Sequence, residues 1–336
     1  MAILITGGAG YIGSHTAAEL LDANEEIIIL DNLQKGHIGA VQGGKFSKGD
    51  LRDDEFLDKV FRENSIDAVI HFAADSLVGE SVSDPLKYYN NNMVSTLRLL
   101  TKMKEYDVQK IVFSSTAATY GEPENTPILE ADRTLPTNPY GETKLSVEKA
   151  LKWADNAYGI KYVSLRYFNA AGAHISGKIG EDHSPESHLI PIILQVALGK
   201  RESIQIFGDD YNTPDGSCVR DYIHVTDLAQ AHILALKKLR NGGDSSVYNL
   251  GNGKGFSVKE VVALVRQVTG IDIKEIIAPR RAGDPAVLIA SSEKIQKELK
   301  WEPKYNELST IIETAWNWHK NHPDGYNEAS KISSLP

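Results

Sequence analysis

A short apolar run, followed by a glycine-rich turn and then a helix, is the feature that most constrains this chain. Residues Ala2–Thr6 predict a buried strand, and Tyr11–Leu21 predict a helix. Gly7, Gly10 and Gly13 follow the strand at three-residue spacing. In such a unit the first glycine permits the tight turn, the second lets a pyrophosphate approach the backbone, and the third allows close packing of the helix. The free N–H groups at the start of the helix then favour the binding of a phosphate. The alternative interpretation of the glycine pattern is a turn between strand and helix that binds no ligand.

The residue after the second predicted strand, Ile27–Leu30, is an acid, Asp31. A carboxylate at this place binds both ribose hydroxyls of an adenosine and repels a 2′-phosphate, so the sequence predicts NAD and not NADP. Lys35 lies nearby and weakens this preference, because it could pair with a phosphate. The alternative is a surface carboxylate at the end of a strand.

Strand and helix patterns alternate through the first half of the chain. Further strands are predicted over Asp67–Ala73, Ile111–Phe113 and Tyr162–Leu165, and helices over Pro85–Glu105 and Tyr140–Tyr158. This alternation predicts an α/β fold, a Rossmann-type doubly wound parallel sheet with helices on both faces.

The second half predicts a smaller mixed α/β domain. Its best-signalled helix has a capping box of Ser257 and Glu260 and ends at Gly270. The other elements expected here are a helix within Ser187–Gly199, a strand at Ile204–Gly208, a helix at Val225–Leu239, a strand at Val247–Leu250 and a helix at Leu308–Trp318. We expect residues 1–170 with about 220–250 to bind NAD, residues 171–219 and 251–325 to bind the substrate, and 326–336 to form a tail.

Composition excludes several classes of protein. The 336 residues carry a formal net charge of −9, which argues against nucleic acid or a membrane surface as the partner, because both need clustered basic residues. No leader and no membrane span are predicted. The single cysteine, Cys218, permits no intrachain disulfide, fits a cytoplasmic setting, and is interpreted as a spare buried thiol.

A tyrosine and a lysine, Tyr140 and Lys144, stand four residues apart on a predicted helix and so share one face. A phenol with a pKa near 10 is a weak base, but a neighbouring ammonium and a positive nicotinamide ring would both favour the phenolate. Such a tyrosine could act as a general acid and base. Just upstream, Ser114, Ser115 and Thr116 follow a strand, and any one of these hydroxyls could bridge Tyr140 and a substrate oxygen.

Together, the glycine turn, the hydroxyl triplet and the Tyr-x-x-x-Lys pair resemble the extended short-chain dehydrogenase/reductase family. Longer stretches resemble the UDP-glucose 4-epimerases within it: Thr6–His15, Val69–Ala73, Val78–Ser81, Phe113–Gly121, Leu165–Ala173, Val219–Val225 and Pro279–Asp284. The resemblance covers roughly residues 1–325.

This resemblance implies a reversible inversion at C4 of UDP-glucose and UDP-galactose through a 4-keto sugar, with tightly held NAD recycled. Tyr140 would take the proton of the 4-hydroxyl, Lys144 would hold the nicotinamide ribose and keep Tyr140 acidic, and Thr116 stands where the family has its catalytic serine. A homodimer is also implied, through apolar faces on Pro85–Glu105 and Tyr140–Tyr158, and no metal.

The resemblance also assigns binding positions. Those for the cofactor are Gly7, Gly10, Tyr11, Ile12, Gly13, Asp31, Asn32, Asp50, Leu51, Phe72, Ala73, Asn91, Tyr140, Lys144 and Phe168. Those for the substrate are Thr116, Tyr140, Asn169, His188, Leu189, Arg220, Arg281, Asp284 and Leu288. The two arginines would contact the diphosphate, which suits the fork of a guanidinium.

Three positions depart from the family pattern. Ser76 replaces a lysine of some members, His188 replaces an asparagine at a substrate contact, and Leu288 stands at the position that sets the room for the C2 substituent. Leucine is intermediate in size there, so an epimerase of UDP-N-acetylglucosamine, or one of dual specificity, is the alternative.

Other functions were weighed on the same residues. A 4,6-dehydratase needs an acid directly after Thr116, where this chain has Ala117 and Ala118, so dehydration is disfavoured. A net dehydrogenase would release NADH at each turnover, and only the resemblance speaks against it. A non-catalytic NAD-binding regulator would not need Tyr140 and Lys144 together.

Overall fold

The centre of the molecule is a parallel sheet of seven strands. The computed structural model describes residues 1–281 and 285–326. Every pairing in this sheet is parallel, and the strand order is β3-β2-β1-β4-β5-β6-β11. The strands are β1 (Ala2–Thr6), β2 (Ile27–Asp31), β3 (Lys45–Lys48), β4 (Ile66–His71), β5 (Lys110–Ser114), β6 (Lys161–Tyr167) and β11 (Ser246–Leu250). The order reverses between β1 and β4, which is where open α/β sheets bind their ligands.

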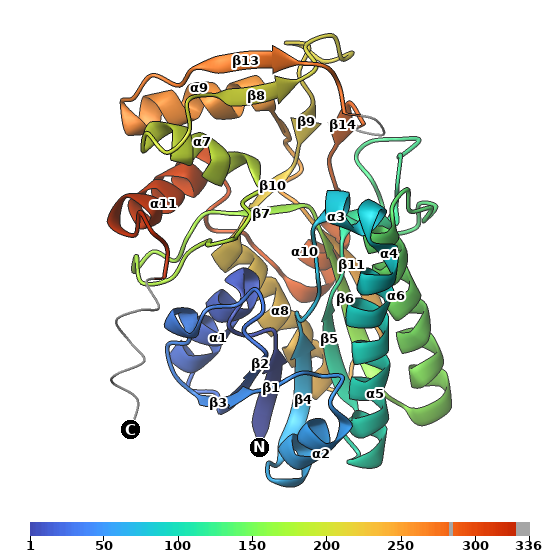
Figure 1. Cartoon of the computed structure of the whole chain (residues 1–336). Helices are drawn as coiled ribbons and strands as arrows, with labels where there is room; N and C mark the ends of the chain where they lie inside the picture. Colours follow the sequence, from blue (N-terminus) through green and yellow to red (C-terminus); the bar gives the residue numbers. More distant parts are fainter. Residues whose placement is uncertain (282–284, 327–336) are drawn as a thin grey trace.

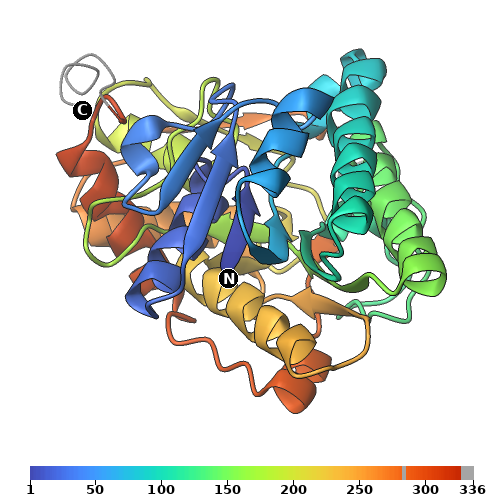
Figure 2. The same ribbon diagram turned by 90° about the horizontal axis from the view of Figure 1, so that it is seen from below.

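Helices cover both faces of this sheet, as Figures 1 and 2 show. One face carries α1 (Tyr11–Asp22), α8 (Val225–Arg240) and α10 (Glu293–Leu299), and the other carries α2 (Asp54–Arg62), α5 (Ser95–Glu105) and α6 (Pro139–Tyr158). Alternate residues of one strand enter the two cores: Ile3 and Ile5 face α1 and α8, whereas Ala2 and Leu4 face α2 and α5. The predicted Rossmann-type doubly wound sheet is therefore confirmed.

A smaller group of elements lies beyond the carboxyl ends of the sheet strands (Figure 1). Its core gathers apolar residues of α7 (Leu189–Ala197), α9 (Val258–Thr269) and α11 (Leu308–Asn321). Short strands complete it: β7 (Asn169–Ala171) pairs with β10 (Tyr222–His224), β8 (Ile204–Phe207) with β13 (Glu275–Ala278), and β9 (Val219–Arg220) with both β12 (Phe256–Ser257) and β14 (Val287–Leu288). The remaining elements are α3 (Val78–Ser83), α4 (Pro85–Tyr88) and the short helical turns η1 (Ile38–Ala40), η2 (Tyr89–Val94) and η3 (Ala117–Thr119).

Elements with a strong local signal lie where the sequence predicts them. The capping box of Ser257 and Glu260 begins α9, and Gly270 ends it with φ of 71°. The sequence analysis missed α2, although its N-cap Asp53 accepts a hydrogen bond from the Phe56 N–H, a signal that the sequence carries. It also missed β3, whose KFSK sequence is half-exposed at the sheet edge and has no apolar alternation.

The predicted helix over Pro85–Glu105 is wrong in its details. The structure divides it into α4, the π-helical turn η2 and α5. Leu100, after the turn, enters the core, whereas Leu86, before it, is 78% exposed. A π-helical turn shifts the faces of the helix on its two sides relative to one another, so a pattern with period 3.6 assigns them incorrectly.

None of the helices in residues 1–281 and 285–326 is long and apolar enough to cross a bilayer.

Candidate active site

The glycine turn leaves no room for side chains. Gly7 has a φ of 70°, and a Cβ there would lie 2.6 Å from the backbone nitrogen of Ala73. A Cβ on Gly13 would lie 2.2 Å from the carbonyl oxygen of Gly7. These two glycines therefore bring β1, the start of α1 and the end of β4 into close contact. The resulting cradle presents backbone N–H groups at a helix start, which fits the phosphates of a dinucleotide.

Asp31 holds this turn in place as well as ending β2. Its carboxylate accepts hydrogen bonds from the backbone N–H of Ala9 (3.0 Å) and of Leu33 (2.8 Å). Burial raises the pKa of Asp31, and the two backbone hydrogen bonds oppose that effect. Each carboxylate oxygen has two lone pairs, so Asp31 keeps capacity for the two hydroxyls of a ribose.

The neighbouring residues that are predicted to contact the cofactor form a polar group beside Asp31. Asn32 donates to Asp50 at 3.0 Å, and Arg52 contacts the same carboxylate through Nε at 2.8 Å and Nη2 at 2.7 Å. The Arg52 side chain holds the pKa of Asp50 well below its usual range. Sequence reasoning did not single out Arg52, although it stands two residues after Asp50.

The remaining residues that are predicted to contact the cofactor lie around the same edge of the sheet. Leu51 is buried, and Phe72 packs on His232 with ring centroids 4.7 Å apart. The Tyr11 hydroxyl donates to the Gly172 carbonyl at 2.6 Å, which ties the start of α1 to the segment after β7. Ile12 packs against the core beneath α1, and Phe168 joins β6 to β7.

Asn91 and its neighbour Asn92 lie in the π-helical turn η2. Asn92, which the sequence did not single out, is the buried one: its side-chain nitrogen donates to the Asp75 carbonyl at 3.0 Å and to the Thr143 hydroxyl at 3.1 Å. Its oxygen accepts the Asp75 N–H at 2.8 Å. Asn92 therefore connects η2 to the segment after β4 and to α6.

The structure separates the roles of the three hydroxyls after β5. Ser114 is hydrogen-bonded to the Tyr167 hydroxyl, and Ser115 donates to Glu148 at 2.5 Å. Thr116 is the one of the three whose side chain lies near enough to the Tyr140 phenol to lower its pKa. Of the three candidates left open by the sequence, Thr116 is thus the one placed to bridge Tyr140 and a substrate oxygen.

Tyr140 lies in the first turn of α6 and is buried. Burial raises the pKa of Tyr140, and the hydrogen bond with Thr116 partly opposes this. Lys144 was expected to lower the pKa of Tyr140, but in the chain without a cofactor the pKa of Tyr140 is raised. A positive nicotinamide ring beside the phenol would supply the missing stabilisation of a phenolate.

Lys144 is buried one turn after Tyr140. Its ammonium donates to the Ser114 carbonyl at 2.8 Å and lies 4.9 Å from the centroid of the Phe113 ring. Burial lowers the pKa of Lys144 to about 7, against the attraction of Glu148. A lysine with a pKa of about 7 changes its charge near neutral pH.

We expect this buried lysine to make stability depend on pH in the nucleotide-free protein. Between pH 7 and about 10.4 the unfolded chain holds a proton that folded Lys144 lacks, so Lys144 should contribute a rise in the free energy of unfolding of up to about 1.4 kcal/mol per pH unit. Urea unfolding at pH 7.5, 8.5 and 9.5 gives the total slope. Lys144→Met should lower this slope by the contribution of Lys144, and Lys149→Met, at an exposed position of α6, should leave it unchanged. Equal slopes in all three proteins would contradict the assignment.

A cavity of about 490 Å³ lies within the smaller group of elements. It is lined by five of the predicted substrate residues: Asn169, His188, Leu189, Arg220 and Arg281. Asn169 begins β7, two residues after Tyr167, whose hydroxyl bonds Ser114. The segment from β6 to β7 therefore connects the Tyr140 region to this cavity.

The cavity combines cations with an aromatic ring. The Arg281 guanidinium lies 3.9 Å from the centroid of Phe207, and both residues line the cavity. Arg220 donates to the carbonyls of Val219 and Pro285 at 2.8 and 2.9 Å, which fixes the direction of its side chain. Phe207 and Arg201, a further basic residue of the lining, were not identified from the sequence. Such a surface suits a ligand in which a flat ring lies next to a negatively charged group.

The other residues considered in the sequence analysis have various surroundings. Leu288 on β14 pairs in register with Arg220 but is not one of the described residues that line the cavity. Cys218 is buried in the cavity wall. Tyr326, assigned to the tail, instead packs on Trp318 and accepts the N–H of Gly180. Asp284 and residues 327–336 lie outside the described residues.

The chain is similar to known epimerases over nearly all of its length. It is 66% identical to a UDP-glucose 4-epimerase of Halalkalibacterium halodurans over 331 residues, 98% of this chain and 99% of that one. A crystal structure of a UDP-glucose 4-epimerase matches with a TM-score of 0.96 and 59% identity over 98% of this chain and 100% of that one. One from Bifidobacterium longum, in complex with NAD⁺ and UDP, has a TM-score of 0.92 and 42% identity over 97% and 100%.

The family model agrees with these relatives. Residues 3–251 match the model described as the NAD dependent epimerase/dehydratase family, and this range holds the glycine turn, Tyr140 and Lys144. The match covers well over half of the chain. The chain belongs to the NAD dependent epimerase/dehydratase family.

Proposed function

We propose that this chain is an NAD-dependent enzyme that interconverts UDP-glucose and UDP-galactose by inverting C4. The observations that carry the proposal are Thr116, Tyr140 and Lys144 at the carboxyl edge of a dinucleotide-binding sheet, and a cavity in the smaller group of elements that Arg220 and Arg281 line. The relatives named above, with their high identity, support the same reaction.

Each group has one task in this proposal. Tyr140 accepts the proton of the sugar 4-hydroxyl and later returns it, while Thr116 orients that hydroxyl. Lys144 contacts the nicotinamide ribose and biases Tyr140 toward the phenolate when it is charged. When bound, NAD supplies the acceptor and donor of the C4 hydride. Arg220 and Arg281 hold the diphosphate, and Phe207 offers its ring to the uracil.

The binding regions divide in the same way. Residues 1–170 with about 220–250 hold NAD, in the cradle of Gly7, Gly10 and Gly13. Residues 171–219 and 251–325 hold the UDP-sugar. Most of the cavity lining supports this division, since α7, β8 and Arg281 belong to the second group, whereas Asn169 and Arg220 lie at the boundaries of the first.

The direct test is turnover without added cofactor. Purified protein incubated with UDP-galactose alone should form UDP-glucose, because the bound NAD returns to its starting state in each cycle. Product that appears only with added NAD, in stoichiometric amounts, would indicate a net dehydrogenase. No turnover at all would favour a non-catalytic NAD-binding protein.

Substrate range is a separate question, for which the alternative is activity on the N-acetylated sugars. Leu288 is the proposed gate, acting beside Arg220. A steric gate of one small group discriminates by only about 1–3 kcal/mol, so weak activity on UDP-N-acetylgalactosamine is expected. Comparing kcat/KM for both sugar pairs in the wild type and in Leu288→Tyr decides whether this position controls the preference.

Asp31 should select NAD over NADP. Its two oxygens already accept the N–H groups of Ala9 and Leu33, so a 2′-phosphate would meet a fixed carboxylate with no room to turn away. We expect NAD to bind at least about tenfold more tightly, equivalent to about 1.4 kcal/mol. Titration of nucleotide-free protein with both cofactors measures this ratio, and equal affinities would contradict the role of Asp31.

A homodimer is proposed through the exposed apolar side chains of α4, α5 and α6. Leu86, Leu97 and Trp153 are all exposed on these helices, which lie together at one side of the molecule (Figure 1). Apolar groups gathered on one face mark an interface. A cytoplasmic setting, expected from the single cysteine, remains a prediction.

Leu97→Glu should convert this dimer into a monomer, because the interface would have to bury the new charge. Light scattering coupled to gel filtration measures the mass. Ile276→Glu is the matched control, since Ile276 is equally exposed but lies on β13, far along the chain in the smaller group of elements. A wild-type protein that is already monomeric, or a dimer that tolerates Leu97→Glu, would refute the interface.

A further inference from the structure

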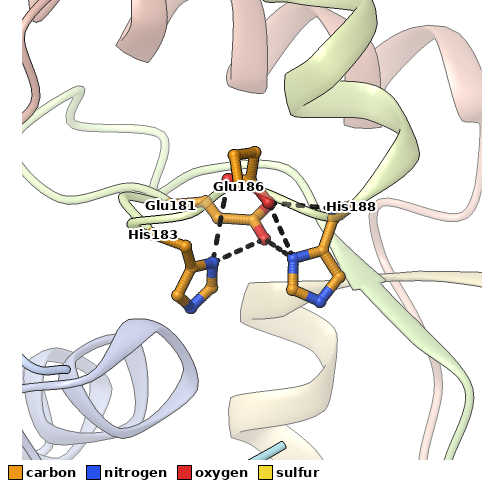
Figure 3. Close-up of side chains that lie close together, drawn as sticks. All are labelled: Glu181, His183, Glu186 and His188. Atoms are coloured by element: carbon orange, nitrogen blue, oxygen red, sulfur yellow. Dashed lines mark hydrogen bonds and ion pairs between the residues drawn. The ribbon is translucent and has the colours of Figure 1, made fainter. Parts of the chain in front are cut away.

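Two histidines and two glutamates converge in the segment between β7 and α7 (Figure 3). They are Glu181, His183, Glu186 and His188, and each offers one ligand atom within 4.8 Å of all the others. The side chains of Glu181 and Glu186 are only 3% and 4% exposed. No metal is predicted from the sequence, and of these four residues only His188 is predicted to have a role, as a substrate contact.

The contacts point to a common centre. His188 Nδ1 lies 2.8 Å from Glu181 Oε1 and 3.0 Å from Glu186 Oε1. His183 Nδ1 lies 3.2 Å from Glu181 Oε1 and 3.8 Å from Glu186 Oε2. A tetrahedral zinc ion with bonds of about 2.0–2.1 Å separates its ligand atoms by about 3.3 Å. The four measured separations bracket that value.

Hydrogen bonds between pairs of these side chains leave some of their buried polar atoms without a partner. Glu181 Oε1 is buried and, among the described residues, has no hydrogen-bond partner of acceptable geometry; the same holds for His183 Nδ1. An imidazole Nδ1 can donate only one proton, yet that of His188 faces oxygens of two carboxylates. A buried carboxylate oxygen directed at such a centre is what a metal ligand requires.

The charges of the four side chains also favour a cation between them. Two buried carboxylates need two positive charges, which one divalent ion supplies to neutral imidazoles. The alternative is a pair of imidazolium ions: burial lowers the pKa of His183 and of His188, but the carboxylates raise them to about 9 and about 10. That alternative balances the charge but leaves Glu181 Oε1 without a well-aligned donor.

The surroundings hold the ligands in position. Glu186 Oε1 accepts the backbone N–H groups of Ser187 at 2.7 Å and of His188 at 2.8 Å. The Trp318 indole donates to the Glu181 carbonyl at 3.2 Å, and the Tyr11 ring packs edge-on against His183. Outer contacts of this kind fix the ligands of metal sites.

We propose that Glu181, His183, Glu186 and His188 bind one divalent transition-metal ion, with zinc as the first candidate. Two imidazoles and two carboxylates suit zinc, and no open position is needed for a structural ion. The ion would connect α1, through Tyr11, to the start of α7, which carries Leu189 into the substrate cavity. Its role is to fix the wall of that cavity, not to take part in proton or hydride transfer.

The test uses the full-length chain without a polyhistidine tag. After dialysis against a chelator, calorimetric titration with Zn²⁺ should show one ion per chain, and mass spectrometry should find the same ratio in protein grown with zinc. At 100 times the dissociation constant, zinc should raise the Tm by about 4 °C. Absence of saturable 1:1 binding in the wild type would overturn the proposal without any variant.

Variants locate the site. His183→Gln should weaken zinc binding by more than about 100-fold, beyond what the loss of an outer contact costs. Glu186→Gln, which keeps the side-chain shape, is a second variant should the first fail to fold. His322→Gln is the matched control, because His322 stacks on Trp318 outside the cluster. Zinc affinity unchanged in both His183→Gln and Glu186→Gln would refute the assignment.

Discussion

Replacing Tyr140 by phenylalanine is expected to lower turnover by about 10²–10⁴-fold, the usual contribution of a positioned acid and base. The variant keeps the ring that is buried in the first turn of α6 and loses only the hydroxyl that meets Thr116. Turnover of UDP-galactose under saturating conditions measures the effect.

The fold should survive this change, because phenylalanine keeps the buried ring and the lost hydroxyl makes at most one hydrogen bond, worth about 1 kcal/mol. Circular dichroism and the amount of NAD bound per chain provide the check. Thr116→Val is the companion variant, since it removes the other side of the same hydrogen bond and leaves the phenol. We expect a smaller loss there. Near-normal turnover in Tyr140→Phe would exclude Tyr140 from the mechanism.

The sequence was sufficient for the features that local patterns encode. The turn at Gly7 and Gly13, the capping box of α9 and the spacing of Tyr140 and Lys144 each lie within a few residues, so composition and period define them. The parallel sheet follows from the alternation of such units, and its prediction is confirmed.

Contacts between segments that are far apart in the chain could not be predicted from the sequence. Nothing local separates Ser114, Ser115 and Thr116; their partners Tyr167, Glu148 and Tyr140 come from β6 and α6. The buried Asn92 and the cavity residue Phe207 likewise depend on which segments meet in space. The effect of burial on the pKa of Tyr140 has the same origin, because burial is a property of the fold.

The four-residue cluster shows a pattern that was available but was not used. Glu181, His183, Glu186 and His188 stand at spacings of two, three and two in a segment with no periodic apolar residues. Of these four residues, only His188 was assigned a role, as a substrate contact. Only the fold reveals that all four side chains turn toward one point (Figure 3).

Arg166→Met is expected to destabilise the protein by about 3–5 kcal/mol, the usual cost of breaking a buried ion pair from one side. Arg166 contacts Glu148 through Nε at 3.0 Å and Nη2 at 2.5 Å, and the two side chains are 7% and 6% exposed. Arg166 also donates to the Tyr120 hydroxyl at 2.9 Å, whose proton goes to Asn249. Methionine fills much of the volume but leaves the Glu148 carboxylate with the Ser115 hydroxyl alone.

The consequence should extend to the active site. Glu148 lies one turn after Lys144 on α6 and already favours the charged form of that lysine. Without Arg166, its carboxylate would attract Lys144 more strongly and raise the pKa of the lysine, so the pH dependence of stability described above should move to higher pH. Urea unfolding at several pH values measures both effects.

Two further variants make the result decisive. Arg62→Met breaks an exposed pair with Asp58, for which the expected cost is below about 1 kcal/mol. The double variant Glu148→Leu with Arg166→Met removes both buried charges, and we expect it to recover most of the stability lost in the single variant. Recovery would show that the penalty comes from an uncompensated charge beneath Lys144. A double variant as unstable as the single one would instead assign the loss to packing around Tyr120, and Arg166 would have no electrostatic part in holding α6 against the sheet.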